Sequence, residues 1–124
     1  MTAIKMTMRT CATLALLLGL TMWIFGLAIP PLVLSHIALA VILLVLSVTW
    51  LIMSRQSNST LRTLQAVIIA LVLVTMVAGN YQGNIGYPTG NIIHLILALA
   101  LIGTIETTIA RQNRLARATM SQRA

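Results

Sequence analysis

The sequence predicts an all-α membrane protein, a four-helix transmembrane bundle of up-down-up-down topology with both termini in the cytoplasm. Its composition is the first reason. Hydrophobic residues make up 59% of the 124 residues and charged residues only 7%, whereas soluble domains carry about 25% charged residues. Mean hydropathy is +1.00. The other two reasons are four long apolar runs and the one-sided placement of the basic residues.

The four apolar runs predict spans at about residues 11–29, 32–53, 61–79 and 91–110, and one domain covering residues 1–124. The first run is longer than the roughly 7–15 apolar residues of a signal peptide, so we interpret it as a retained span. Pro30 and Pro31 end it, because proline fits only the first turn of the following helix. Residues 54–60 and 80–90 are polar or rich in Gly, Asn and Pro, so they are expected to be loops.

All eight basic residues fall on one side of this arrangement. They are Lys5, Arg9, Arg55, Arg62, Arg111, Arg114, Arg117 and Arg123. The positive-inside rule therefore predicts cytoplasmic termini, in an integral protein of the bacterial inner membrane. The net charge of +7 is explained by orientation and by contact with the lipid bilayer. It does not indicate nucleic-acid binding, because no base-stacking residues lie among the arginines.

The chain has the pattern of a tandem duplicated helical hairpin. The second expected helix of each half carries a histidine about one turn inside its outer end, followed by alanine four residues later. These residues are His36 with Ala40 and His94 with Ala98. In the first expected helices, the aligned residues are Leu17, Thr21 and Met22 with Leu71, Thr75 and Met76. Because both halves have the same orientation, the repeat is a parallel one.

If the four helices pack in ring order, the second and fourth are parallel and diagonal, so His36 and His94 face each other at one depth. Two such imidazoles can bind both axial positions of a haem iron. Alanine at i+4 lies on the same helix face and leaves room for a porphyrin. Gly26 and Gly79 are expected where the flanking helices approach its edges. The predicted cofactor-binding residues are His36, His94, Ala40, Ala98, Gly26 and Gly79, with the two histidines as metal ligands.

Other interpretations of these polar residues stay open at this point. Each histidine could instead bond a backbone carbonyl or water near a helix end, or the pair could carry protons in a small transporter. Two histidines would give zinc or copper too few protein ligands. Glu106, the only acidic residue, is expected about 18 Å further inward than His94. It is expected to pair with Arg62 or Arg111, and a role with protons or a quinol is the alternative.

The pattern resembles that of membrane b-type cytochromes, in which histidines on paired helices of a four-helix bundle hold a haem. The segment from Leu64-Gln65 to Gly79, followed by His94-Leu95-Ile96-Leu97-Ala98, is also similar to a half of haem A synthase. The resemblance implies haem ligation by His36 and His94 and no more. The stretch from His94 to Glu106 is similar as well to small four-span bacterial membrane proteins without an assigned role.

The sequence therefore predicts a membrane b-type cytochrome with one bis-histidine haem b, which transfers electrons with a quinol or an external one-electron partner. Any enzymatic role would be oxidoreductase chemistry, because no residue set supports acyl, phosphoryl or hydrolytic catalysis. The alternative is a cofactor-free structural or accessory subunit of a larger membrane complex. The oligomeric state, the redox partner and the role of Glu106 do not follow from the sequence.

Overall fold

The computed structural model describes residues 2–54 and 58–122, which form four α-helices and no strand. The helices are α1 (Thr2–Phe25), α2 (Pro30–Met53), α3 (Ser59–Ile85) and α4 (Thr89–Ser121). Each is long and apolar enough to cross a membrane. The prediction of an all-α, four-helix membrane protein is confirmed for the part of the chain that the structure describes.

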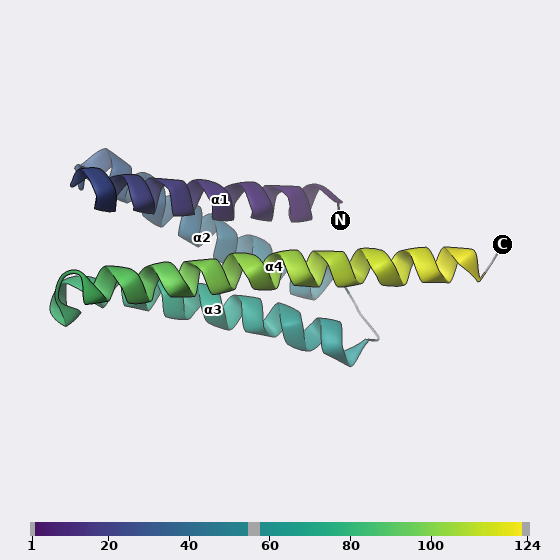
Figure 1. Ribbon diagram of the computed structural model, residues 1–124. Coiled ribbons are helices and arrows are strands. Elements are labelled where there is room, and N and C mark those ends of the chain that lie inside the picture. Colours follow the sequence, from purple (N-terminus) through teal and green to yellow (C-terminus); the bar gives the residue numbers. More distant parts are fainter. Residues whose placement is uncertain (1, 55–57, 123–124) are drawn as a thin grey trace.

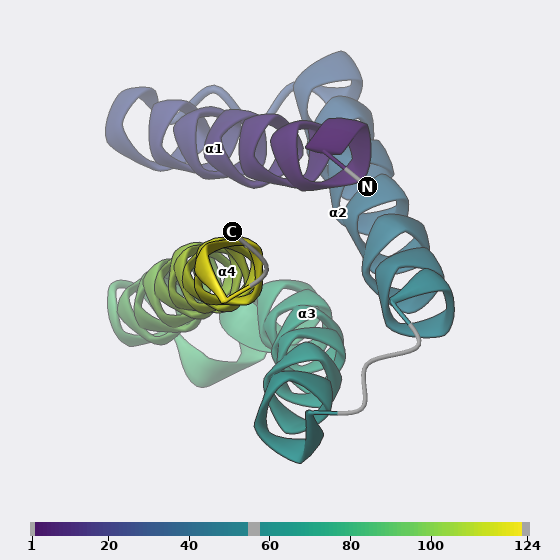
Figure 2. The same cartoon turned by 90° about the vertical axis from the view of Figure 1, so that its right-hand side faces the viewer.

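The helices form a ring in chain order. Each helix packs against the next, and α4 packs against α1 to close the ring. Figure 2 shows this order in an end-on view. The two helix pairs that are not consecutive, α1 with α3 and α2 with α4, therefore lie diagonally. Figure 1 shows the N- and C-terminal ends of the chain at the same end of the bundle, as an up-down-up-down path requires.

Four helix ends differ clearly from the predicted spans. α1 begins at Thr2 instead of about residue 11, and α4 continues to Ser121 instead of about residue 110. A glycine explains the other two differences. α1 stops at Phe25 instead of continuing to Ile29, because Gly26 adopts a left-handed φ of 64°. Such a conformation after a helix C-terminus is typical of glycine. α3 continues to Ile85, beyond the predicted end at Gly79, and stops where Gly86 has a φ of 92°. The predicted outer loop at residues 80–90 is therefore mostly helix.

The starts of α2 and α3 follow from capping chemistry. α2 begins at Pro30 after an extended Ile29, as expected for proline in a first turn. The Asn58 side chain accepts a hydrogen bond from the Leu61 backbone N–H at 3.3 Å and caps α3. α4 runs without interruption for 33 residues. Its basic C-terminal part projects beyond the other helices (Figure 1).

The tightly packed core lies in the half of the bundle that carries the termini, which we call the terminal half. The buried apolar side chains there come from all four helices and are Met8, Cys11, Ala12, Leu43, Trp50, Leu61, Ile68, Val72, Leu101, Ile105 and Ile109. Trp50 is only 1% exposed, so it belongs to this core although it lies in the last turn of α2. Because the core is concentrated in this half, the opposite half has space between its helices.

Two polar contacts join α1 to α4 at the terminal end. Arg9 Nε donates to Glu106 Oε1 at 2.6 Å, and Lys5 Nζ donates to Asn113 Oδ1 at 3.2 Å. The expected pairing of Glu106 with Arg62 or Arg111 is therefore replaced by a pair with Arg9. The reason is the ring order, which places the start of α1 beside the second half of α4.

The other junction between the two hairpins has its own polar contact. Ser54 Oγ, at the end of α2, donates to Gln65 Oε1 of α3 at 2.9 Å. Gln65 is itself only 2% exposed. The two hairpins are thus joined at the terminal end by side-chain hydrogen bonds on both sides of the ring, and the described residues of the far end form no such bond between the hairpins.

Candidate cofactor site

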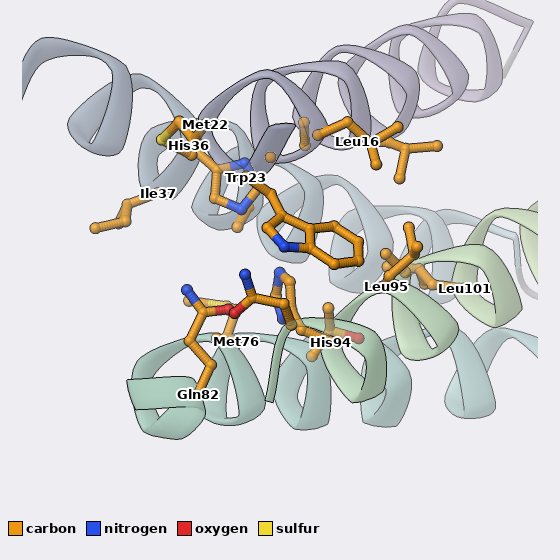
Figure 3. A pocket seen from close by; sticks show the side chains of 18 of the residues that line it. Leu16, Met22, Trp23, His36, Ile37, Met76, Gln82, His94, Leu95 and Leu101 are labelled. Atoms are coloured by element: carbon orange, nitrogen blue, oxygen red, sulfur yellow. The ribbon is translucent and has the colours of Figure 1, made fainter. Parts of the chain in front are cut away.

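The structure brings the two histidines together from diagonal helices. His36 projects from α2 and His94 from α4, and their ring centroids are 6.0 Å apart with an angle of 60° between the ring planes. Figure 3 shows the two rings approaching each other from opposite walls of a cavity. The convergence at one depth is what the duplicated hairpin and the ring order predict.

This separation suits two imidazoles that share one metal ion. A bond from a transition metal to an imidazole nitrogen is about 2.0–2.1 Å long, and the ring centroid lies roughly 1 Å beyond that nitrogen. Two rings on opposite sides of one ion therefore have centroids roughly 6 Å apart. Each ring can turn about its metal–nitrogen axis, so an angle of 60° between the planes is compatible with this arrangement.

A cavity of about 630 Å³ surrounds the histidine pair. We call it the histidine cavity. This volume lies within the range of about 300–1,000 Å³ typical of cofactor and ligand sites. Of the predicted site residues, five line the cavity, namely His36, His94, Ala40, Ala98 and Gly79. They come from α2, α3 and α4, and the two alanines lie on the same helix faces as the histidines.

Gly26 does not join this group. It lies in the turn after α1, has a positive φ, and a Cβ added there would meet nothing within 4 Å. The glycine that does approach an imidazole from α1 is Gly19, which the sequence reasoning missed. The spacing within each hairpin contained a signal for it, because a glycine precedes each histidine by about the same number of residues: Gly19 before His36 and Gly79 before His94.

Each imidazole lies directly against the glycine of its own hairpin. A Cβ added to Gly19 would be 3.2 Å from His36 Cε1, and a Cβ added to Gly79 would be 2.8 Å from His94 Cε1. In both cases Nδ1 is nearer to the glycine than Nε2 is. Glycine at these positions therefore holds each ring in place, and Nε2 is the nitrogen turned further from the neighbouring helix.

The buried ring nitrogens have no hydrogen-bond partner among the described residues. Nδ1 of His36 and Nδ1 of His94 are both unpaired, as is the hydroxyl of Thr75. The backbone carbonyl of Thr75 lies beside the His94 imidazole, without completing a hydrogen bond to Nδ1. Histidines that bind metals usually donate the other ring N–H to such a carbonyl. Buried polar atoms without partners are uncommon in proteins. Three of the five in the described residues lie at this cavity, and the other two are Trp50 Nε1 and Gln112 Oε1.

The cavity walls repeat between the two hairpins, which identifies the register of the duplication. Lining residues of α1 and α3 occur in pairs separated by a constant interval along the chain. The pairs are Ala12 with Val72, Ala15 with Thr75, Leu16 with Met76, Gly19 with Gly79, Leu20 with Asn80 and Met22 with Gln82. The predicted register, which aligned Thr21 with Thr75, is therefore wrong, because the structure pairs Thr75 with Ala15. The prediction rested on a few identities that were mostly apolar.

The lining residues of α2 and α4 also occur in pairs at one constant interval. They are Val33 with Asn91, His36 with His94, Ile37 with Leu95, Ala40 with Ala98 and Leu43 with Leu101. The cavity thus has approximate twofold symmetry about the bundle axis. The two histidines are equivalent positions in it, and a ligand between them meets similar walls on both sides apart from the unpaired lining residue Trp23 of α1.

The two histidines fit a metal ion whose other ligands come from its cofactor. Within residues 2–54 and 58–122, no group of three or more His, Cys, Asp or Glu side chains could hold a metal ion. Structural zinc needs four such ligands, and catalytic zinc usually has three. A metalloporphyrin needs only two ligands from the protein, on opposite faces, together with a mostly apolar space for the macrocycle.

Fold and site together define an integral membrane four-helix bundle with a two-histidine cavity. No family model, curated protein or solved structure matches the chain. The resemblance to b-type cytochromes and to haem A synthase therefore stays a prediction from the sequence.

Proposed function

We propose that this protein is a membrane b-type cytochrome that binds one haem b between His36 and His94. The observation that carries the proposal is the 6.0 Å separation of two opposed imidazoles inside a cavity of cofactor size. When bound, haem b supplies a one-electron redox centre, and two imidazole ligands leave no open position on the iron. Electron transfer is therefore the proposed role, and oxygen binding is not.

The chain's own residues have separable tasks in this proposal. His36 and His94 hold the iron through Nε2. Gly19 and Gly79 fix the position of the rings by close contact. The alanines at i+4 keep the space between the helices open, and the mostly apolar walls favour burial of a large apolar macrocycle.

The proposed orientation follows from charge. The described basic residues lie at the terminal end, which by the positive-inside rule supports cytoplasmic termini. The proposed location is the bacterial inner membrane. The histidine cavity then lies in the outer half of the bilayer. A quinol in the membrane, or a one-electron carrier outside it, is the proposed partner. Glu106 lies at the opposite end of the bundle, paired with Arg9, and has no part in the haem site.

The experiment is a reduced-minus-oxidised absorbance spectrum of the purified protein. We expect a red preparation with a haem b spectrum, and we expect His36→Ala and His94→Ala each to remove the six-coordinate form. Added imidazole should restore it in either variant, since the free ligand can fill the space left by the side chain. This rescue separates loss of a ligand from loss of the fold.

A colourless preparation that remains colourless after haem addition contradicts the proposal. It favours the alternative, a cofactor-free structural or accessory subunit whose histidines serve contacts between helices.

A further inference from the structure

The histidine cavity is symmetric in shape but not in chemistry. At several equivalent wall positions, the first hairpin has an apolar side chain and the second a polar one. These pairs are Ala15 with Thr75, Leu20 with Asn80, Met22 with Gln82 and Val33 with Asn91. Because the difference has the same direction in all four pairs, one side of the cavity is suited to a polar group and the other is not.

The polar side chains of the second hairpin come from two neighbouring helix ends. Asn80 and Gln82 lie near the end of α3, and Asn91 lies in the first turn of α4. Gly90 lies so close to the Gln82 backbone that a Cβ there would collide with the Gln82 carbonyl. This contact keeps the start of α4 against α3. We call Asn80, Gln82 and Asn91 the amide cluster; Figure 3 shows Gln82 on the His94 side of the cavity.

The ring order decides which helices face the edges of a flat ligand. A macrocycle held between His36 and His94 has its faces toward α2 and α4, so its lateral edges face α1 and α3. Three of the paired differences lie on these two edge-facing helices. The α1 edge is apolar apart from the single indole N–H of Trp23, and the α3 edge has amides at the end of the cavity away from the core.

Haem b has a matching asymmetry, because its two carboxylates lie on one edge and its other edges carry methyl and vinyl groups. Asparagine and glutamine each have two N–H donors, and hydrogen bonds to a carboxylate are stronger than those between neutral groups. The described basic residues lie at the terminal end, so the donors that line the cavity besides the imidazoles are the amides, the Thr75 hydroxyl and, on the α1 side, the Trp23 indole N–H. One indole N–H cannot satisfy two carboxylates, so burying them on the α1 side would be costly.

We propose that the amide cluster binds the two propionates of the haem, and so gives the cofactor one orientation in a cavity of twofold shape. This inference rests on the proposed haem site. It assigns Asn80 and Gln82 the role of binding carboxylates, and it assigns the paired Leu20 and Met22 of α1 to contact with the apolar edge.

The test compares two probes in haem-free protein of full length, purified in detergent: haem b and haem b dimethyl ester, in which both carboxylates are blocked. The variant is Asn80→Leu with Gln82→Met, which gives α3 the residues of α1 at the equivalent positions. We expect it to bind haem b about tenfold more weakly or worse, since hydrogen bonds to charged groups are lost. Its affinity for the dimethyl ester should stay unchanged, which also shows that the cavity is intact.

The matched control is Asn84→Leu, a change of the same kind on the same helix at an exposed residue outside the cavity lining. It should leave the affinity for both probes as in the unaltered protein. If the double variant binds haem b as tightly as the unaltered protein, or loses both probes equally, the assignment of the amide cluster is wrong. If the unaltered protein binds neither probe, the haem site itself is wrong, and the assignment falls with it.

Discussion

A single methyl group at Gly79 should displace the His94 imidazole. The Cβ of an alanine at this position would lie 2.8 Å from His94 Cε1 and 3.2 Å from Nδ1. Ordinary contacts between carbon atoms are about 3.5–4.0 Å long, so the ring has to retreat by roughly 1 Å. Within the described residues the ring borders the histidine cavity, so it moves into the cavity and changes the 6.0 Å separation from the His36 ring or the angle between the two rings.

The expected magnitude follows from this displacement. Inserting a methyl group into a filled site typically costs about 1–3 kcal/mol, and a ring moved by roughly 1 Å no longer has a relaxed metal–nitrogen bond. We therefore expect Gly79→Ala to weaken haem b binding by about ten- to a hundredfold. Gly19→Ala should have the smaller effect, because its added Cβ would lie 3.2 Å from His36 Cε1.

Haem b titration of the haem-free protein, followed by absorbance, measures this effect. The control is Gly103→Ala in α4, where an added Cβ meets nothing within 4 Å. Both alanines raise helix propensity to a similar extent, by about 1 kcal/mol at most, so the difference between them isolates the contact with the ring. Equal haem affinity of Gly79→Ala and the unaltered protein, or an equal loss in Gly103→Ala, would refute the reasoning.

Three further predictions concern the cavity, the ion pair and the topology. Ala98→Leu should fill the histidine cavity and abolish haem b binding, whereas Ala110→Leu, on the exposed face of the same helix, should leave the absorbance spectrum unchanged. Arg9 and Glu106 are 53% and 44% exposed, so a double-mutant cycle of thermal unfolding should give a coupling of about 1 kcal/mol or less, with no change in the haem spectrum. Tyr87→Cys, at a residue that is 79% exposed, should react with a membrane-impermeant thiol reagent added to intact cells; no labelling until the cells are lysed would reverse the proposed orientation.

The sequence was a good guide to the fold because membrane spans are defined locally. A helix inside a bilayer satisfies all its backbone hydrogen bonds within the segment, so the length and composition of each apolar run suffice to identify it. The predicted ends of the helices were less accurate than their number. Gly26 and Gly86 decide where α1 and α3 stop through their backbone conformation, and hydropathy contains no information about φ.

The candidate site was predicted in part, for a related reason. His36 and His94 stood out because ionisable residues are rare in spans and these two occupy corresponding places in a repeat. Gly19 was missed because glycine is common in membrane helices and only its contact with His36 distinguishes it. The register of the repeat was also wrong, since aliphatic residues align equally well at several offsets.

The sequence by itself determined the number of apolar helices, their composition and the choice of His36 and His94 as candidate site residues. All of these depend on short segments of the chain. Only the tertiary structure decided that Glu106 pairs with Arg9, that Trp50 is buried, and that the packed core lies in one half of the bundle and a cavity in the other. It alone showed that the equivalent walls of that cavity differ in polarity. These properties depend on how side chains from distant segments meet, and that is set by the packing of helices around a ring.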